Sequence, residues 1–371
     1  MLGVTVLGVV ALSGVLVAWI LYPMALAVIP KRASSGRSIS TPLPTVTVVV
    51  ATREVPAAVV DRVDNLRASA YPGELLDVVV AVDVSSNWPV HEYQQQLGDR
   101  AVAVAGDAPG GKAVTLNAAV RAARGEVLVF ADTGQRFAPD AIALLVHSLG
   151  GGCFDAVSGR YETQHTGGAV LEGFWRFEQY LRRSEARVHS IPVVTGAIYA
   201  MRRRLWAPLP AQVICDDLWV PLELILRGHR VGYCEEALAV DPRRFTRTQE
   251  FRRKVRTLTG ILQLCAWMPQ VLVPWRNPVW TQFICHKLLR VATPFLVVLA
   301  GIALIPPVVI AHGRWLLPGG GIVLGVIVAT AVIRPATAGR LLRDLSWAMM
   351  LLMAPVPATY RAARRRWDVW G

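Results

Sequence analysis

Lysine is scarce in this chain of 371 residues. Of its 39 basic residues, only those at positions 31, 112, 254 and 287 are lysines, and the other 35 are arginines. A solvated surface lysine is the ordinary interpretation of any single lysine. That interpretation is weakened here, because the chain relies so heavily on arginine for its basic residues. Lys112, which directly follows Gly110 and Gly111, is therefore a candidate binding residue.

Patterns that would indicate disulfides, zinc or repeats are also missing. The five cysteines, at positions 153, 215, 234, 265 and 285, form no C-x-x-C pair and show no zinc spacing. The simplest interpretation is that they are reduced thiols in a cytoplasmic setting. None of the seven histidines has a partner at metal-ligand spacing, so we assign them no role. Internal repeats and low-complexity tracts are not visible either.

The first 30 residues contain no charged side chain. About 20 apolar residues suffice to cross a bilayer, so residues 1–30 are predicted to form an N-terminal transmembrane helix. A signal peptide is the alternative, because Ala25-Leu26-Ala27 resembles a cleavage site. A basic n-region is missing, however, and the apolar run is too long. An uncleaved anchor followed by a linker at 31–44 is favoured, with Lys31 and Arg37 on the cytoplasmic side.

Composition favours a multi-pass membrane protein. Apolar residues make up 53% of the chain and its formal net charge is +13, with a mean hydropathy of +0.41. Nucleic-acid binding could explain the charge, but the arginines cluster beside apolar segments, at 31–37, 334–343 and 361–366, as the positive-inside rule describes. We therefore expect no nucleic-acid partner. The expected location is the cell membrane, in a bacterium, with the soluble part in the cytoplasm.

The C-terminal third is predicted to be a membrane region. Residues 259–290, with Trp267 and Trp275, have the aromatic and apolar character of interfacial helices. Residues 291–371 form the predicted C-terminal membrane region, with spans at 291–311 and 317–333. Residues 345–360 are short, contain two prolines and have arginines on both sides. We expect that last segment to be re-entrant or interfacial.

Between these regions, residues 45–258 alternate strands with helices. Apolar runs at 45–51, 76–82, 101–104 and 126–131 predict buried strands. Helices are predicted at 56–69, 113–123, 140–149, 168–187 and 218–226, and further strands at 156–160, 193–201 and 231–233. Such alternation implies an α/β fold with a doubly wound, mostly parallel sheet. Glu54, Asp83 and Asp132 follow three of the strands, so we expect them at one edge of the sheet.

The most informative stretch runs from Gly110 to Gly134. It reads as a glycine-led loop, a helix with Gly125 at the C-cap position, and a strand that ends at Asp132. A lysine in a glycine-rich turn and a carboxylate at a strand end suit a nucleotide diphosphate and its metal ion.

These segments together resemble the membrane-anchored inverting glycosyltransferases of family 2, the GT-A fold group that includes cellulose, chitin and hyaluronan synthases. The resemblance runs from Thr45 to about Leu264. It is carried by VTVVVATRE, AVDVSSN, GGKAVTLNAAVRAARGEVLVFADTG, VTGAIYAMRRRLW and the CDD segment that ends at Asp217. The segment RKVRT, at 253–257, lies where processive members carry Gln-x-x-Arg-Trp.

The resemblance implies sugar transfer, with inversion, from a nucleotide-sugar donor, with UDP as the expected nucleotide. The implied acceptor is a lipid-linked or cell-envelope glycan, and the implied cofactor is Mg²⁺ or Mn²⁺. Asp217 corresponds to the catalytic base and Asp132 to a metal ligand. The implied donor-binding residues are Glu54, Asp83, Lys112, Asn117, Arg253 and Arg256, and the implied acceptor-side residues are Trp175, Gly196 and Asp216.

Two departures from the family pattern matter. The metal motif is Asp132-Thr133-Gly134, so its second acid is missing and metal affinity should be weak. The Gln and Trp of the processive signature are absent too, which argues against long-chain polymer synthesis. A catalytically degenerate domain that binds nucleotide or acts as a scaffold in an envelope complex is therefore the alternative function.

Several site residues also have a purely structural interpretation. Asp216 or Asp217 could simply cap the helix that begins near 218. Asp83 could be an ordinary turn residue, Trp175 could pack in the core, and Arg253 and Arg256 could be solvated surface residues.

Overall fold

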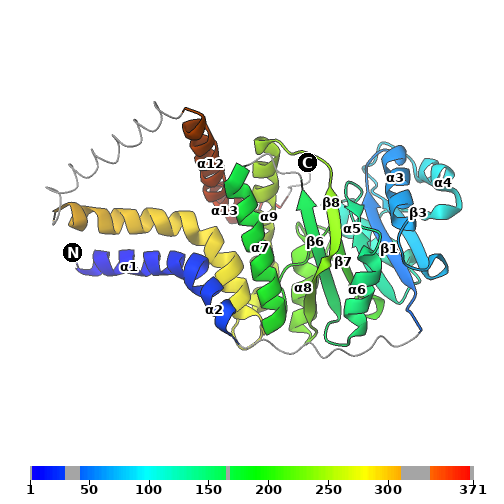
Figure 1. Cartoon of the computed structure of the whole chain (residues 1–371), viewed down its shortest axis with the longest axis horizontal. Coiled ribbons are helices and arrows are strands. Elements are labelled where there is room, and N and C mark those ends of the chain that lie inside the picture. Colours follow the sequence, from blue (N-terminus) through cyan, green and yellow to red (C-terminus); the bar gives the residue numbers. More distant parts are fainter. Residues whose placement is uncertain (1, 30–41, 164–167, 311–334, 368–371) are drawn as a thin grey trace.

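The chain is organised around a single eight-stranded sheet. The computed structural model describes residues 2–29, 42–163, 168–310 and 335–367 (Figure 1). The strand order is β3-β2-β1-β4-β7-β6-β8-β5. The strands are β1 Val46–Thr52, β2 Leu76–Val82, β3 Val102–Ala105, β4 Val127–Ala131, β5 Arg136–Phe137, β6 Ala156–Thr163, β7 Ile198–Arg202 and β8 Val231–Asp241.

The sheet is parallel in its first half and mixed in its second. β3, β2, β1 and β4 pair in parallel, whereas β7 runs antiparallel to both of its neighbours, β4 and β6. The register pairs Thr52 with Val82 and Val50 with Ala131. The residues that follow these strand ends therefore lie at one edge, which confirms the predicted gathering of Glu54, Asp83 and Asp132.

Helices cover both faces of the sheet, as the α/β prediction requires. Successive side chains of a strand point to opposite faces, so Val48 and Val50 of β1 join one buried apolar cluster and Val49 joins the other. The first cluster contains α3 Pro56–Arg67, α4 Val90–Leu97 and α6 Ala141–Gly150. The second contains α5 Lys112–Ala122, α8 Asp216–Leu226 and α9 Arg247–Trp267.

Gly125 does not have the predicted role of a helix C-cap. The C-cap of α5 is Ala123, and Gly125 is not among the glycines with positive φ. Its backbone instead presses against β1: a Cβ at this position would lie 2.5 Å from the backbone nitrogen of Thr47. Glycine is needed here for close approach of two chain segments rather than for a left-handed turn.

Two helices are long and apolar enough to cross a membrane, Gly3–Val28 and Trp280–Ile310. They lie side by side and project away from the sheet (Figure 1). Their contact is close, because a Cβ at Gly8 would lie 2.7 Å from the Cβ of Ala303. The indole Nε1 of Trp19 donates a hydrogen bond of 3.0 Å to Thr293. Most of their apolar surface is left exposed by the rest of the chain, as expected of surface that faces lipid.

A buried polar cluster joins this helix pair to α7 (Gly168–Val188). His286 on the second apolar helix contacts Glu185 at 2.8 Å and Glu178 at 3.1 Å, and both glutamates belong to α7. Arg290 forms an ion pair with Glu178, and the hydroxyl of Tyr22 donates to Glu185. Pairing and hydrogen bonding offset the cost of burying these charges, so the cluster links the helix pair to α7.

The predicted interfacial region at 259–290 is wrong in its first and last parts. Residues 259–267 belong to α9, whose Ile261 and Leu264 are buried in the domain core, so the predicted boundary at 258 falls inside a helix. Residues 280–290 begin the long helix Trp280–Ile310. Apolar periodicity alone does not distinguish a helix packed on protein from one packed on lipid headgroups.

The end of the chain folds back onto the domain. It forms α12 Pro335–Met353 and α13 Pro355–Ala363, which pack against α7 and α9; Ala354 and Ala358 are buried against Val255 of α9. The predicted span at 317–333 and most of the predicted linker, including Lys31–Arg37, lie outside the described residues.

Candidate active site

A glycine loop before α5 forms the first wall of the site. Gly110 and Gly111 have φ of 93° and 99°, a backbone conformation that favours glycine. Asp83 fixes this loop: one carboxylate oxygen accepts from the backbone and hydroxyl of Ser85, and the other from the backbone of Gly111 and the hydroxyl of Thr115. Burial raises the pKa of Asp83, but these hydrogen bonds outweigh it and hold the pKa below its usual value.

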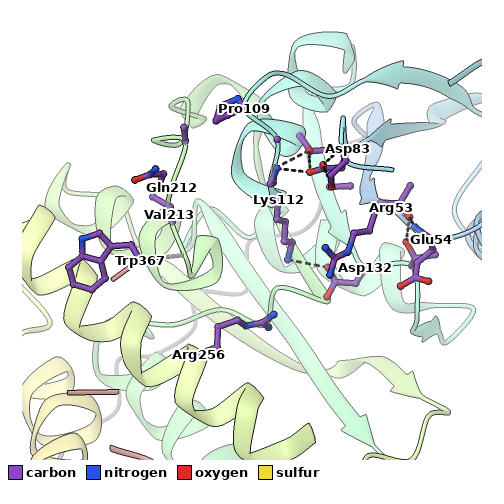
Figure 2. Close-up of a pocket in the computed structure, with 18 of the residues that line it drawn as sticks. Arg53, Glu54, Asp83, Pro109, Lys112, Asp132, Gln212, Val213, Arg256 and Trp367 are labelled. Carbon is purple, nitrogen blue, oxygen red and sulfur yellow. Dashed lines mark hydrogen bonds and ion pairs between the residues drawn. The ribbon is translucent and has the colours of Figure 1, made fainter. Parts of the chain in front are cut away.

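Two adjoining pockets lie at this edge of the sheet. The larger, of about 810 Å³, contains Glu54, Asp83, Lys112 and Asp132 in its walls (Figure 2). The smaller, of about 200 Å³, lies on the other side of Lys112 and is lined by Trp175, Gly196, Asp216 and Asp217, among others. Lys112, Asp132 and Arg256 line both pockets, so the two spaces meet at these three residues.

Lys112 lies among three carboxylates at this meeting point. Its Nζ is 3.1 Å from Oδ1 of Asp132 and 3.4 Å from Oδ1 of Asp216. Burial lowers the pKa of Lys112, but the charges of Asp132, Asp216 and Asp217 outweigh it and raise the pKa, so the amine stays protonated. Gly196 closes over this group, because a Cβ there would lie 3.3 Å from the lysine Nζ and 3.4 Å from the Cβ of Asp217.

Asp216 and Asp217 occupy the first turn of α8 without capping it. The N-cap residue is Cys215, and its side chain makes no capping hydrogen bond, so the capping alternative considered above is wrong. Asp216 is 5% exposed, and its Oδ2 has no hydrogen-bond partner among the described residues. Burial and the neighbouring charge of Asp216 raise the pKa of Asp217 to about 6, against the opposing effects of Lys112 and Arg256.

The place of the missing second acid is filled by an arginine. A Cβ at Gly134 would lie 2.3 Å from the guanidinium carbon of Arg243. Asp241, which is fully buried, holds this guanidinium through two hydrogen bonds of 2.9 and 2.8 Å. With Lys112 on Asp132 and Arg243 over Gly134, two cations occupy the surroundings in which a divalent metal would have to bind. The residues present therefore do not fit a metal site.

The structure brings ten of the eleven predicted site residues to a pocket wall. The larger pocket contains Glu54, Asp83, Lys112, Asp132 and Arg256, and the smaller contains Lys112, Asp132, Trp175, Gly196, Asp216, Asp217, Arg253 and Arg256. Arg253 also contacts Glu250 at 3.1 Å and lies over the ring of Phe245. Neither it nor Arg256 is a merely solvated surface residue.

Asn117 is the exception, because it lines neither described pocket. Its side-chain amide donates to the backbone carbonyl of Leu209 and accepts from the backbone nitrogen of Leu209, both at 2.8 Å. The amide thus holds the segment that continues to Ala211, Gln212 and Val213, which do line the larger pocket. Asn117 therefore positions residues of the pocket wall, and the predicted direct contact with the donor is not supported by its position.

Sequence reasoning missed several residues that line the larger pocket, among them Arg243 and Trp367. Arg243 follows β8, which was predicted to end at 233 but continues to Asp241. The apolar residues at 237–240 were the available signal. Trp367 follows α13 and packs edge-on against Trp267 of α9. In Figure 2 it lies across the pocket from Asp83. No local pattern indicates that the chain end returns to the site.

Comparisons with known proteins identify the family of this chain. The family model described as "Glycosyltransferase like family 2" matches residues 44–266, whereas no curated protein matches the chain. The mannosyltransferase PcManGT from Pyrobaculum calidifontis, solved in complex with GDP-Man and Mn²⁺, is similar over 98% of this chain and 99% of its own, with a TM-score of 0.72 and 19% identity. Glucosyl-3-phosphoglycerate synthase from Mycobacterium tuberculosis is similar over 60% of this chain and 79% of its own, with a TM-score of 0.43 and 18% identity. The chain therefore belongs to glycosyltransferase family 2 and has the GT-A fold of nucleotide-sugar-dependent transferases.

Proposed function

We propose that the chain transfers a sugar from a nucleotide-sugar donor to a membrane-associated acceptor, with inversion, and that Asp217 is the general base. One observation carries this proposal: the two pockets meet at Lys112 and Asp132, with Asp83 in the wall of the larger pocket and Asp217 in the wall of the smaller. A transferase needs two such spaces, one for each substrate, that share a single point of reaction.

The larger pocket suits the donor. Its volume of about 810 Å³ lies in the range typical of small-molecule sites. Lys112, which follows the glycine loop, offers an ammonium group to a diphosphate. UDP was the nucleotide expected from the sequence, whereas the similar mannosyltransferase structure holds GDP-Man. Both nucleotides therefore belong in the test.

The smaller pocket suits the acceptor hydroxyl. Asp217 would accept its proton as the acceptor oxygen bonds to the anomeric carbon and the bond from that carbon to the diphosphate oxygen breaks. A base pKa of about 6 is close to the pH at which the base has to work, which is favourable for proton transfer. Lys112 and Arg256, which line both pockets, would stabilise the charge that develops on the leaving nucleoside diphosphate.

The sequence predicts a divalent metal ion, but the geometry of the site does not favour one. Asp132 is the single carboxylate of the motif, and Lys112 lies 3.1 Å from it. Mg²⁺ or Mn²⁺ would supply the same charge stabilisation that the nearby cations can supply. We therefore assign no step to a metal.

The proposed acceptor and location rest on the helices outside the sheet. Two apolar helices leave the domain together, and the arginine-rich flanks favour a cytoplasmic domain in a multi-pass protein of the cell membrane. An acceptor built on a lipid or on a growing envelope glycan would meet the site beside this membrane surface.

The test is a donor screen with the full chain purified in detergent. UDP- and GDP-linked sugars are supplied with membrane lipid extract as acceptor, and release of nucleoside diphosphate is scored together with a labelled product. Release that depends on the acceptor and is lost in Asp217→Asn supports the proposal. Nucleotide binding without any transfer would favour the scaffold function instead.

A further inference from the structure

We propose that this transferase binds the donor diphosphate without a divalent metal, and that Arg243 is a donor-binding residue in place of the missing second acid of the metal motif. The inference rests on the proposed function of the larger pocket as the donor site. It concerns the position opposite Gly134, where the sequence shows only a missing carboxylate.

The guanidinium of Arg243 occupies the space that a side chain at position 134 would need. All three nearest atoms to a Cβ built on Gly134 belong to this group, at 2.3, 2.5 and 2.5 Å. An aspartate at 134 is thus incompatible with Arg243 as it stands. A cation thus occupies the space that the second acid of the metal motif would need.

Hydrogen bonds to Asp241 fix the position of the Arg243 side chain. Asp241 accepts from its Nε, its Nη2 and its backbone nitrogen. The same carboxylate accepts from Gln135 at 2.9 Å and from the hydroxyl of Tyr161 at 3.0 Å, and it is fully buried. Five hydrogen bonds thus fix the carboxylate that orients the guanidinium. The side chain of Arg243 is still 49% exposed and lines the larger pocket, so part of it is available to a ligand.

The charge of the pocket matches a diphosphate without added metal. Five basic side chains line the larger pocket against three acidic ones: Arg53, Lys112, Arg243, Arg256 and Arg365 against Glu54, Asp83 and Asp132. The excess of two positive charges already opposes the two or three negative charges of a nucleoside diphosphate. Arginine binds phosphate oxygens through paired N–H groups in one plane.

The first experiment measures binding of UDP and GDP to the full chain in detergent by calorimetry, in excess EDTA and again with millimolar Mn²⁺ or Mg²⁺. We expect the better nucleotide to bind with a Kd that changes less than about threefold between these conditions. Binding that is lost in EDTA and restored by either ion would overturn the inference and leave the proposed function standing. If neither nucleotide binds under any condition, the proposed donor site itself is wrong.

The second experiment tests Arg243 directly. Arg243→Ala should raise the Kd for the nucleoside diphosphate by at least tenfold in EDTA, whereas Arg244→Ala, at the next residue and outside both pockets, should change it less than twofold. Arg243→Lys keeps the charge and should recover part of the affinity, which also covers the case in which the alanine variant fails to fold. An unchanged Kd in a folded Arg243→Ala variant would overturn the role of this residue.

The third experiment restores the family pattern. The double variant Gly134→Asp/Arg243→Ala removes the arginine and returns the second acid to the space that it leaves. We expect weak nucleotide binding in EDTA and at least tenfold tighter binding with Mn²⁺, a metal dependence that the parent lacks. A double variant that binds as tightly in EDTA as the parent would contradict the proposed exchange of a metal ligand for a cation.

Discussion

The Nζ of Lys112 lies 3.1 Å from Oδ1 of Asp132, at the place where the donor-sized and acceptor-sized pockets meet. Lys112 is the first residue of α5 and Asp132 directly follows β4, and both line the two pockets at this edge of the sheet. The lysine thus ties the glycine loop to the strand end. It also leaves a positive charge within reach of both substrates of the proposed reaction.

Asp83 should contribute to stability as well as to the shape of the donor pocket. The substitution Asp83→Asn removes a carboxylate that accepts four hydrogen bonds. We expect a loss of about 1–3 kcal/mol in unfolding free energy, as for other buried polar groups left poorly paired, and weaker nucleotide binding. Chemical denaturation with a calorimetric Kd measures both. Ser85→Ala removes a single hydroxyl donor and should have a much smaller effect.

The contribution of Asp83 to stability also depends on pH. Because its pKa is lowered in the folded state, the unfolded chain takes up a proton first. The stabilisation is therefore full above the unfolded pKa of about 3.9 and is lost as pH falls through the lower folded value. Parent and Asp83→Asn stabilities should converge in strong acid, and a difference that stays constant down to pH 2 would contradict this account.

The elements that could be predicted from the sequence are those with a clear local pattern of apolar and turn residues. β2 Leu76–Val82 was predicted to the residue, because a run of valines between turn residues has no good alternative to a buried strand. The end of the helix at Leu226 was also correctly predicted, although the helix begins two residues earlier, at Asp216. The positions of the motif residues could be predicted together with these elements, because the motif residues lie where strands and helices begin or end.

The parts that could not be predicted depend on contacts distant in sequence. β5 has two residues and exists only by pairing with β8. Asn117 lies within a family motif, yet its partner is Leu209, 92 residues away. The guanidinium of Arg243 lies against Gly134, more than 100 positions earlier in the chain. The sequence around neither residue indicates this contact. Sequence patterns located the pocket with Lys112 and Arg256, whereas the place of Arg243 in it required the fold.

The topology assignment can be tested independently of catalysis. Residues 1–30 carry no charge and basic residues follow from Lys31, so the catalytic domain should be cytoplasmic. A reporter fused at Ser35 should be active in its cytoplasmic form and inactive in its exported form. The opposite result would place the domain outside the cell, away from nucleotide sugars, and would remove the proposed donor chemistry with it.

Asp217→Asn should reduce turnover without impairing the fold. Asparagine keeps the size of the side chain, and its neutrality suits a position where burial disfavours the charged form. We expect kcat to fall at least ~10²-fold, the low end for loss of a general base, with donor Kd and Tm close to the parent values. Asp216→Asn should reduce kcat far less. If instead Asp217→Asn stays within a few-fold of the parent and Asp216→Asn is inactive, the roles of the two residues are exchanged.

The pH dependence of kcat separates these two aspartates more sharply than the loss of activity alone. A general base has to be ionised, and burial together with the charge of Asp216 raises the pKa of Asp217 to about 6. The kcat of the parent should therefore fall about tenfold per unit as pH drops below 6. Asp216→Asn removes the like charge that disfavours ionisation of Asp217, so the acid limb should move to lower pH. The residual activity of Asp217→Asn should show no such limb. An acid limb that persists unchanged in Asp217→Asn would mean that the proton is accepted by another group.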